Sequence, residues 1–338
     1  MNDRDEILVR IRDLSVTYHT RLGPVSAVDH VSFDIRRGEI LGLVGESGCG
    51  KSTLGKALLR MITPPAEITS GQILFEGEDI LQFDERRLRD FRGRKASMIF
   101  QDPMTSLNPV QRVEDHLVEA VEVHEQKVER ANVLERVATL IERLGIQKRR
   151  IHDYPHQLSG GMRQRVMIGL GLVLNANLII ADEATTSLDV IVEAKLVDQL
   201  REIRDQYGVS ILVITHNIAL VAEIADRVAV MYAGHLVEMG SVYQIFDHPL
   251  HPYTRGLLRS VPSIKLDDQE ELYKMAGEPP NLTHPPSGCR FHPRCPERMS
   301  LCSQVQPQLR EVAPGHWVQC WLYQDHPDKE SPTLEVTE

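Results

Sequence analysis

The stretch 45–52 reads GESGCGKS and matches the phosphate-binding pattern G-x-x-x-x-G-K-[ST]. It follows an apolar run, 39–44, and precedes a helix-like stretch, 52–61, which is the strand, loop and helix context that the pattern needs. Glycines let backbone N–H groups surround a phosphate, Lys51 is expected to reach the β- and γ-phosphates, and Ser52 to ligate Mg²⁺. The predicted nucleotide contacts are Gly45, Ser47, Gly48, Cys49, Gly50, Lys51, Ser52 and Thr53, and this loop alone leaves kinases, GTPases, helicases and transporters open.

Two carboxylates follow another apolar run, 178–181. Asp182 is suited to hold Mg²⁺ together with Ser52, and Glu183 is suited to polarise the attacking water. Acidic residues also end strands on ordinary protein surfaces. The pair therefore indicates nucleotide hydrolysis only in combination with the glycine-rich loop upstream.

The stretch 158–164, LSGGMRQ, lies between these two motifs. Ser159 is expected to cap a helix and to contact a phosphate, with backbone donors at Gly160 and Gly161 facing the anion. An ordinary helix cap is the alternative interpretation. With the motifs on both sides, the stretch resembles the LSGGQ signature of the ABC ATPase family, with Met162 in place of the usual Gln.

The resemblance implies roles for four more residues. Tyr18 matches the aromatic residue that stacks on adenine, and Gln101 matches the residue that senses Mg²⁺, the attacking water and the membrane partner. Asp189 matches the loop that crosses the dimer interface, and His216 the switch histidine at the γ-phosphate. The alternatives are a half-buried strand aromatic for Tyr18, a surface amide for Gln101, a helix cap for Asp189 and a satisfied loop histidine for His216. The expected catalytic residues are Glu183, His216 and Gln101, and the expected Mg²⁺ contacts are Ser52, Gln101 and Asp182.

The sequence carries one copy of each motif. The family places ATP between the phosphate loop of one cassette and the signature of another. The resemblance therefore implies a second ABC ATPase subunit, either another copy of this chain or a homologous different chain.

Three stretches, 100–109, 154–158 and 251–254, resemble the oligopeptide/dipeptide (peptide/nickel) class of ABC importers. Ala184 departs from the Pro that is usual there. The class implies two transmembrane permease subunits, an extracytoplasmic solute-binding protein, and a peripheral position on the cytoplasmic face of the inner (plasma) membrane. Di- and oligopeptides are the expected cargo, with nickel chelates, glutathione or oligosaccharides as alternatives. An exporter subunit and a soluble ABC ATPase without transport function are the other classes that remain.

Composition and periodicity agree with an α/β fold. We expect a P-loop NTPase with a RecA-like parallel sheet, an antiparallel β subdomain at 7–18 and 25–35, and a helical insertion at about 103–160. Residues 1–250 would form the ATPase domain, and 251–338, rich in Pro, His and Cys, a small C-terminal domain. The net charge of -10 argues against binding to nucleic acid, and no stretch is apolar for long enough to span a membrane.

Four of the five cysteines, Cys289, Cys295, Cys302 and Cys320, fall in the C-terminal region. Their spacing lacks the tight pair that is typical of structural zinc, so it favours a [4Fe–4S] cluster, with zinc or four free thiols as alternatives. The resemblance to this importer class agrees, because some members of the class hold such a cluster. Cys49 is expected to be a packing residue of the glycine-rich loop.

Overall fold

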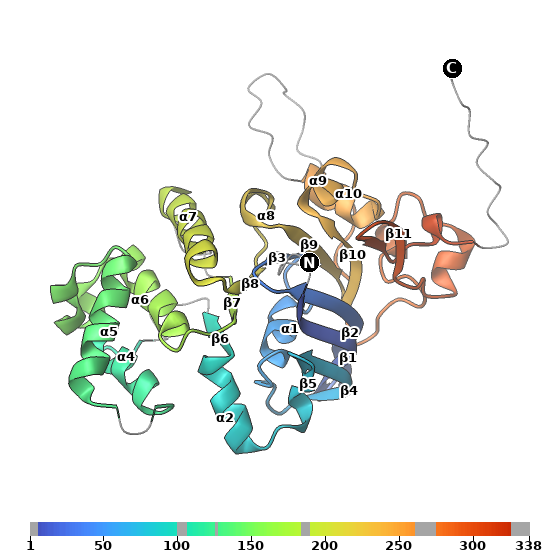
Figure 1. Cartoon of the computed structure of the whole chain (residues 1–338). Coiled ribbons are helices and arrows are strands. Elements are labelled where there is room, and N and C mark those ends of the chain that lie inside the picture. The colour runs from blue at the N-terminus through green and yellow to red at the C-terminus, as the bar shows by residue number, and fades with distance from the viewer. Residues whose placement is uncertain (1–5, 100–106, 126–127, 184–189, 261–274, 326–338) are drawn as a thin grey trace, which may run out of the picture.

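The computed structural model describes residues 6–99, 107–125, 128–183, 190–260 and 275–325. Two sheets organise the part of the chain described (Figure 1). An eight-stranded sheet has the order β11-β12-β10-β9-β3-β8-β7-β6, and a four-stranded sheet has the order β2-β1-β4-β5. Strands of the larger sheet are β3 (Ile40–Val44), β6 (Ala96–Ile99), β7 (Leu178–Asp182), β8 (Ser210–Ile214), β9 (Arg227–Tyr232), β10 (His235–Ser241), β11 (Arg310–Ala313) and β12 (His316–Val318).

The strands β9, β3, β8, β7 and β6 run parallel to one another. All five residues of β3, β7 and β8 are buried, which explains their continuous apolar sequences, since helices cover both faces of a parallel sheet. The parallel sheet predicted from these runs is confirmed in this part. It continues, however, into an antiparallel part, because β10, β12 and β11 pair antiparallel.

The smaller sheet is the predicted antiparallel subdomain. Its hairpin of β1 (Ile7–Thr20) and β2 (Gly23–Arg36) turns at residues 21–22, and β4 (Ala66–Phe75) pairs with the other edge of β1. The short β5 (Glu78–Asp79) follows β4. Alternating apolar residues of β1 and β2 pack on helix α1 (Lys51–Ala57), which lies between the two sheets.

Two α-helices lie within the stretch of about 103–160 where a helical insertion was predicted, and a third begins where that stretch ends. Helices α4 (Val113–Glu122) and α5 (Arg130–Arg143) pack on each other and on α6 (Gly160–Leu172) through an apolar core that includes Leu117 and Ile141. Figure 1 places this group at the opposite end of the molecule from the C-terminal region. The remaining α-helices are α2 (Glu85–Arg94), α7 (Val190–Tyr207), α8 (Ile218–Ile224), α9 (Val242–Asp247) and α10 (Pro252–Arg259). None of the helices in the described ranges is both long and apolar enough to cross a membrane.

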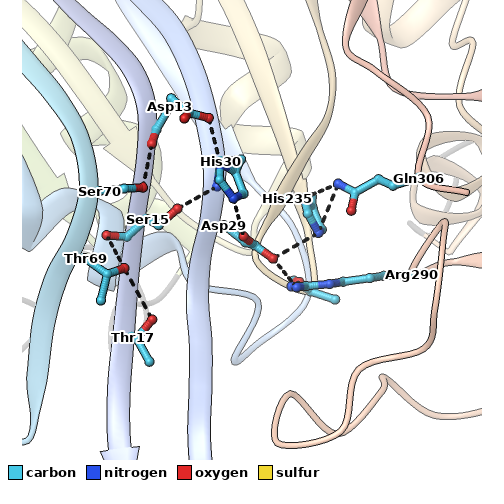
Figure 2. A network of polar contacts seen from close by, with 11 residues as sticks. Asp13, Ser15, Thr17, Asp29, His30, Thr69, Ser70, His235, Arg290 and Gln306 are labelled. Carbon is cyan, nitrogen blue, oxygen red and sulfur yellow. Dashed lines mark hydrogen bonds and ion pairs between the residues drawn. The ribbon is translucent and has the colours of Figure 1, made fainter.

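Residues 275–325 join the ATPase fold through strand pairing and buried polar contacts. Strand β12 pairs with β10, where Glu238 faces Val318, and Nε2 of His316 lies 2.8 Å from Oε1 of the fully buried Glu238. Figure 2 shows a second junction, in which Asp29 at the hairpin contacts both Arg290 and His235. The C-terminal region is thus continuous with the larger sheet, and the domain boundary at 250/251 stays a prediction.

Candidate functional site

The candidate site lies where three neighbouring parallel strands end. In the order β3-β8-β7, the strands end at Val44, Ile214 and Asp182, and each is followed by a predicted functional residue. Carboxyl ends of parallel strands share one edge of a sheet, which is the usual ligand position in α/β folds. The sequence motifs at 45–52, Asp182–Glu183 and His216 are therefore brought together.

The glycine-rich loop connects β3 to α1 in a conformation that its glycines make possible. Gly45 has φ +151 and Gly50 has φ +107, both in the region that favours glycine. A Cβ atom on Gly45 would lie 2.2 Å from the carbonyl oxygen of Met231, and one on Gly50 would lie 2.0 Å from that of Ala27. Any larger residue at these two positions would displace the loop.

Inside the loop, Lys51 is buried and its Nζ donates to the carbonyl oxygens of Gly45 at 2.8 Å and Glu46 at 2.9 Å. Nζ also lies 3.8 Å from Sγ of Cys49, a buried core residue, as expected for a packing role. These contacts hold the ammonium group of Lys51 within the glycine-rich loop. The arrangement is suited to bind a polyphosphate.

The two predicted Mg²⁺ contacts meet across α1 and β7. The hydroxyl of Ser52 donates to Oδ1 of Asp182 at 2.8 Å. Burial, followed by the charge of Glu183, raises the pKa of Asp182, while the hydrogen bond from Ser52 opposes that shift. A carboxylate and a hydroxyl in one buried corner are suited to bind Mg²⁺, whose charge would offset the cost of burying Asp182.

Glu183 and His216 face each other beside this corner. Nδ1 of His216 lies 3.8 Å from Oε1 of Glu183, and the backbone of Glu183 adopts φ +47. The backbone N–H of Glu183 donates to the carbonyl of Ile214 at 2.8 Å, so β8 fixes the position of Glu183 next to His216. An uncommon backbone conformation at a non-glycine residue is frequent at functional sites.

Of the remaining predicted nucleotide contacts, the structure describes Tyr18, Ser159 and Gly160 but not Gln101 or Asp189. The hydroxyl of Tyr18 lies 3.2 Å from Oγ1 of Thr53, which brings the predicted adenine contact to the start of α1. Ser159 caps α6, accepting from the N–H of Met162 at 3.3 Å, and is exposed together with Gly160. Figure 1 shows α6 beside the helices α4 and α5 and apart from α1. Gln101 and Asp189 lie outside the described residues.

The structure adds contacts at the loop that sequence reasoning missed. Nη1 and Nη2 of Arg294 contact the two carboxylate oxygens of Glu46 at 2.8 and 3.0 Å, and the hydroxyl of Tyr253 accepts from the N–H of Glu46 at 2.9 Å. Arg294 and Glu46 are separated by 248 positions. Glu46 lies within the stretch 45–52 and Tyr253 within the HPYT stretch 251–254, but no motif links either of them to Arg294.

The four C-terminal cysteines gather in one region. Burial, and to a smaller extent the charges of the other three sulfurs, raise the pKa of Cys320 to about 12. Backbone N–H groups two positions further along the chain donate to the sulfurs of Cys289, Cys295 and Cys320. Among the described residues, however, no three or more His, Cys, Asp or Glu side chains are arranged to hold a metal ion. The structure therefore gives no support to the predicted [4Fe–4S] cluster or to zinc.

Comparisons with known proteins agree with this geometry. The family described as ABC transporter matches residues 28–186, and the oligopeptide/dipeptide transporter C-terminal region matches residues 237–302. The oligopeptide transport ATP-binding protein OppD of Bacillus subtilis is 42% identical over 98% of this chain and 92% of its own length. The dipeptide transport ATP-binding protein DppD of the same organism is 43% identical over 94% of this chain and 95% of its own.

Solved structures show the same fold. A dimeric bacterial ABC transporter cassette superposes with a TM-score of 0.62 at 22% identity, covering 69% of this chain and 98% of the cassette. The structure of cbiO1 from Clostridium perfringens, part of an ABC transporter complex, has a TM-score of 0.62 at 27% identity and covers 72% of this chain and 92% of its own. The fold and the loop thus define an ABC ATPase cassette. The chain belongs to the ATP-binding proteins of ABC transporters, and within them to the oligopeptide/dipeptide transporter family.

Proposed function

We propose that this chain hydrolyses Mg·ATP with Glu183 as the residue that polarises water, Asp182 and Ser52 as Mg²⁺ contacts, and Lys51 on the β- and γ-phosphates. The observation that carries the proposal is the 2.8 Å hydrogen bond between Ser52 and Asp182, directly beside the loop that holds Lys51. Glu183 follows Asp182 in the chain and faces His216. This arrangement is suited to in-line attack of water on the γ-phosphate.

The cargo follows from the relatives. Proteins named for oligopeptide and dipeptide transport are more than 40% identical to this chain over nearly its full length. We infer that the chain drives import of di- or oligopeptides from the cytoplasmic face of the membrane. Nickel chelates, glutathione and oligosaccharides remain alternatives, because an external binding protein and the permeases select the cargo.

The proposed assembly contains a second ABC ATPase, two permease subunits and, indirectly, a solute-binding protein. Its test is reconstitution in vesicles, followed by ATPase activity and uptake of labelled peptide. Peptide-loaded binding protein should raise ATPase activity, and Lys51→Ala should abolish both readouts. The isolated chain should be a poor ATPase, because its phosphate loop then lacks the signature motif of a second subunit. Full activity of the isolated chain, with a specific activity that does not change with concentration, would contradict this.

A [4Fe–4S] cluster in the C-terminal region is a second proposal, which does not depend on the proposed ATPase mechanism. Its support is the spacing of Cys289, Cys295, Cys302 and Cys320 in the sequence, because the described residues show no arrangement of these side chains that would hold a metal. The four thiolates would hold the irons and stabilise the C-terminal region. Anaerobically purified protein should then contain about four irons per chain. Zinc in their place, or no metal, would remove the cluster from the account.

A further inference from the structure

The phosphate loop contacts the C-terminal region through Glu46. The carboxylate of Glu46 receives two hydrogen bonds from the guanidinium of Arg294, at 2.8 and 3.0 Å, and the Arg294 side chain is only 6% exposed. A bidentate pair of this kind fixes direction as well as distance. Because Glu46 also accepts from Lys51 through its carbonyl oxygen, the position of its backbone is coupled to that of Nζ.

An aromatic cluster fixes Arg294 and the backbone of Glu46. Tyr232, Tyr253 and Phe291 are each at most 2% exposed, and their ring centroids lie 4.5 to 5.5 Å apart. The Tyr253 hydroxyl accepts from the N–H of Glu46, and that of Tyr232 lies 3.3 Å from Nη1 of Arg294. The carboxylate of Glu46 is thus held by Arg294 and its backbone N–H by Tyr253, and both side chains belong to one packed cluster.

A second arginine of the same segment supports the other end of the loop. Arg290 donates to the carbonyl of Ala233 and to the carboxylate of Asp29, as Figure 2 shows for Asp29. Gly234, which follows Ala233 in the chain, donates its N–H to the carbonyl oxygen of Cys49 at 2.9 Å. The segment 289–295 therefore contacts the loop directly through Arg294 and indirectly through Arg290.

We propose that Arg294 is a positioning residue of the nucleotide site, which holds Glu46 so that the loop is ordered before nucleotide arrives. Two physical effects follow. A loop with several glycines loses conformational entropy when it closes on a phosphate, and a loop that is already ordered loses less. Arg294 also neutralises a carboxylate that would otherwise repel the polyphosphate.

The proposal rests on the proposed assignment of residues 45–52 to the phosphates. Its test is calorimetric binding of Mg·ADP to the full-length chain, together with KM and kcat for ATP in the assembled transporter. Arg294→Met should raise the dissociation constant about tenfold, less than for a fully buried pair because the Glu46 side chain is 24% exposed. KM should rise in parallel, whereas kcat at saturating ATP should stay near the wild-type value.

Matched variants separate positioning from charge and from stability. Arg294→Lys keeps the charge without the bidentate geometry, so it should recover only part of the affinity. Glu46→Gln should weaken binding as well, and its combination with Arg294→Met should cost less than the sum of the two. Glu297→Gln is the control, because it removes the 2.7 Å ion pair between Glu297 and Arg255 in the same region, away from the loop.

The outcomes distinguish this inference from the proposed function. Lys51→Ala with wild-type affinity for Mg·ADP would overturn the assignment of the site itself. A strong effect of Lys51→Ala, with Arg294→Met and Glu46→Gln both binding as the wild type does, would overturn the role of Arg294 alone. If Arg294→Met does not fold, Arg294→Lys and Glu46→Gln decide the matter, and equal losses in kcat and stability without a change in KM would also contradict positioning.

Discussion

The hydroxyl of Ser52, the second residue of α1, donates a 2.8 Å hydrogen bond to Oδ1 of Asp182, the last residue of β7. The contact joins residues 130 positions apart. It connects the helix that starts at the phosphate loop to the strand that directly precedes Glu183, the proposed water-polarising residue. The two oxygens proposed to contact Mg²⁺ are therefore adjacent, beside the loop proposed to bind the phosphates.

Asp182→Asn should separate nucleotide binding from the use of Mg²⁺. The amide keeps the shape and can accept from Ser52 but lacks the charge that attracts the cation, so ATP hydrolysis should fall by roughly 10²-fold. Binding of ATP in the presence of EDTA should change little. Titration of activity with Mg²⁺ measures the effect, and an unchanged Mg²⁺ requirement would show that Asp182 is not a ligand.

Much of the site was predictable from the sequence because its motifs lie at the ends of strands. Residues 45–52, Asp182 and His216 follow apolar runs, and the parallel order of the strands brings those ends together. Periodicity also predicted the hairpin of β1 and β2 and the helical insertion.

The C-terminal region was predictable only as a composition change. Its cysteines and prolines gave no indication that β12 would pair with β10, because His316–Val318 is too short for a periodic pattern. The contact between Glu46 and Arg294 was equally inaccessible, since long-range polar pairs depend on tertiary packing and leave no local signal. The strength of such a pair depends on how deeply its side chains are buried, and a single sequence does not reveal that burial.

Phe291 should be important for stability. Its ring is 2% exposed and packs edge-on against Tyr232 and Tyr253, with centroids 5.1 and 5.5 Å away. Phe291→Ala should lower the free energy of unfolding by about 3–5 kcal/mol, the range for deletion of a buried aromatic ring. Urea denaturation measures the change. Tyr243→Ala, at a residue 75% exposed, should change it by less than about 0.5 kcal/mol; equal effects of the two would argue against this core.

His235 should make the protein less stable in acid. Burial, then the charge of Arg290, lowers the pKa of His235 from 6.5 to about 3. Between those values the unfolded chain binds a proton that the folded chain does not, so stability is lost as the pH falls below 6.5, by up to about 1.4 kcal/mol per pH unit.

His235→Gln should remove this contribution to the slope. The free energy of unfolding is measured in urea at several pH values between 4 and 7, with the exposed His248→Gln as the control for the substitution itself. The side chains that face His235 are Asp29, at 3.6 Å, Arg290, His30 and Gln306. A slope as steep in His235→Gln as in the wild type would mean that His235 is not buried in its neutral form.

In the proposed mechanism, Glu183 polarises the attacking water while the loop around Lys51 binds the nucleotide. Glu183→Gln keeps the size of the side chain and removes the base, so it tests the two roles separately. The measurement is single-turnover ATP hydrolysis by the assembled transporter, with bound ATP quantified in the same sample. We expect hydrolysis to fall by roughly 10²-fold or more while ATP stays bound in a closed dimer. Hydrolysis at a rate near that of the wild type would contradict the claim.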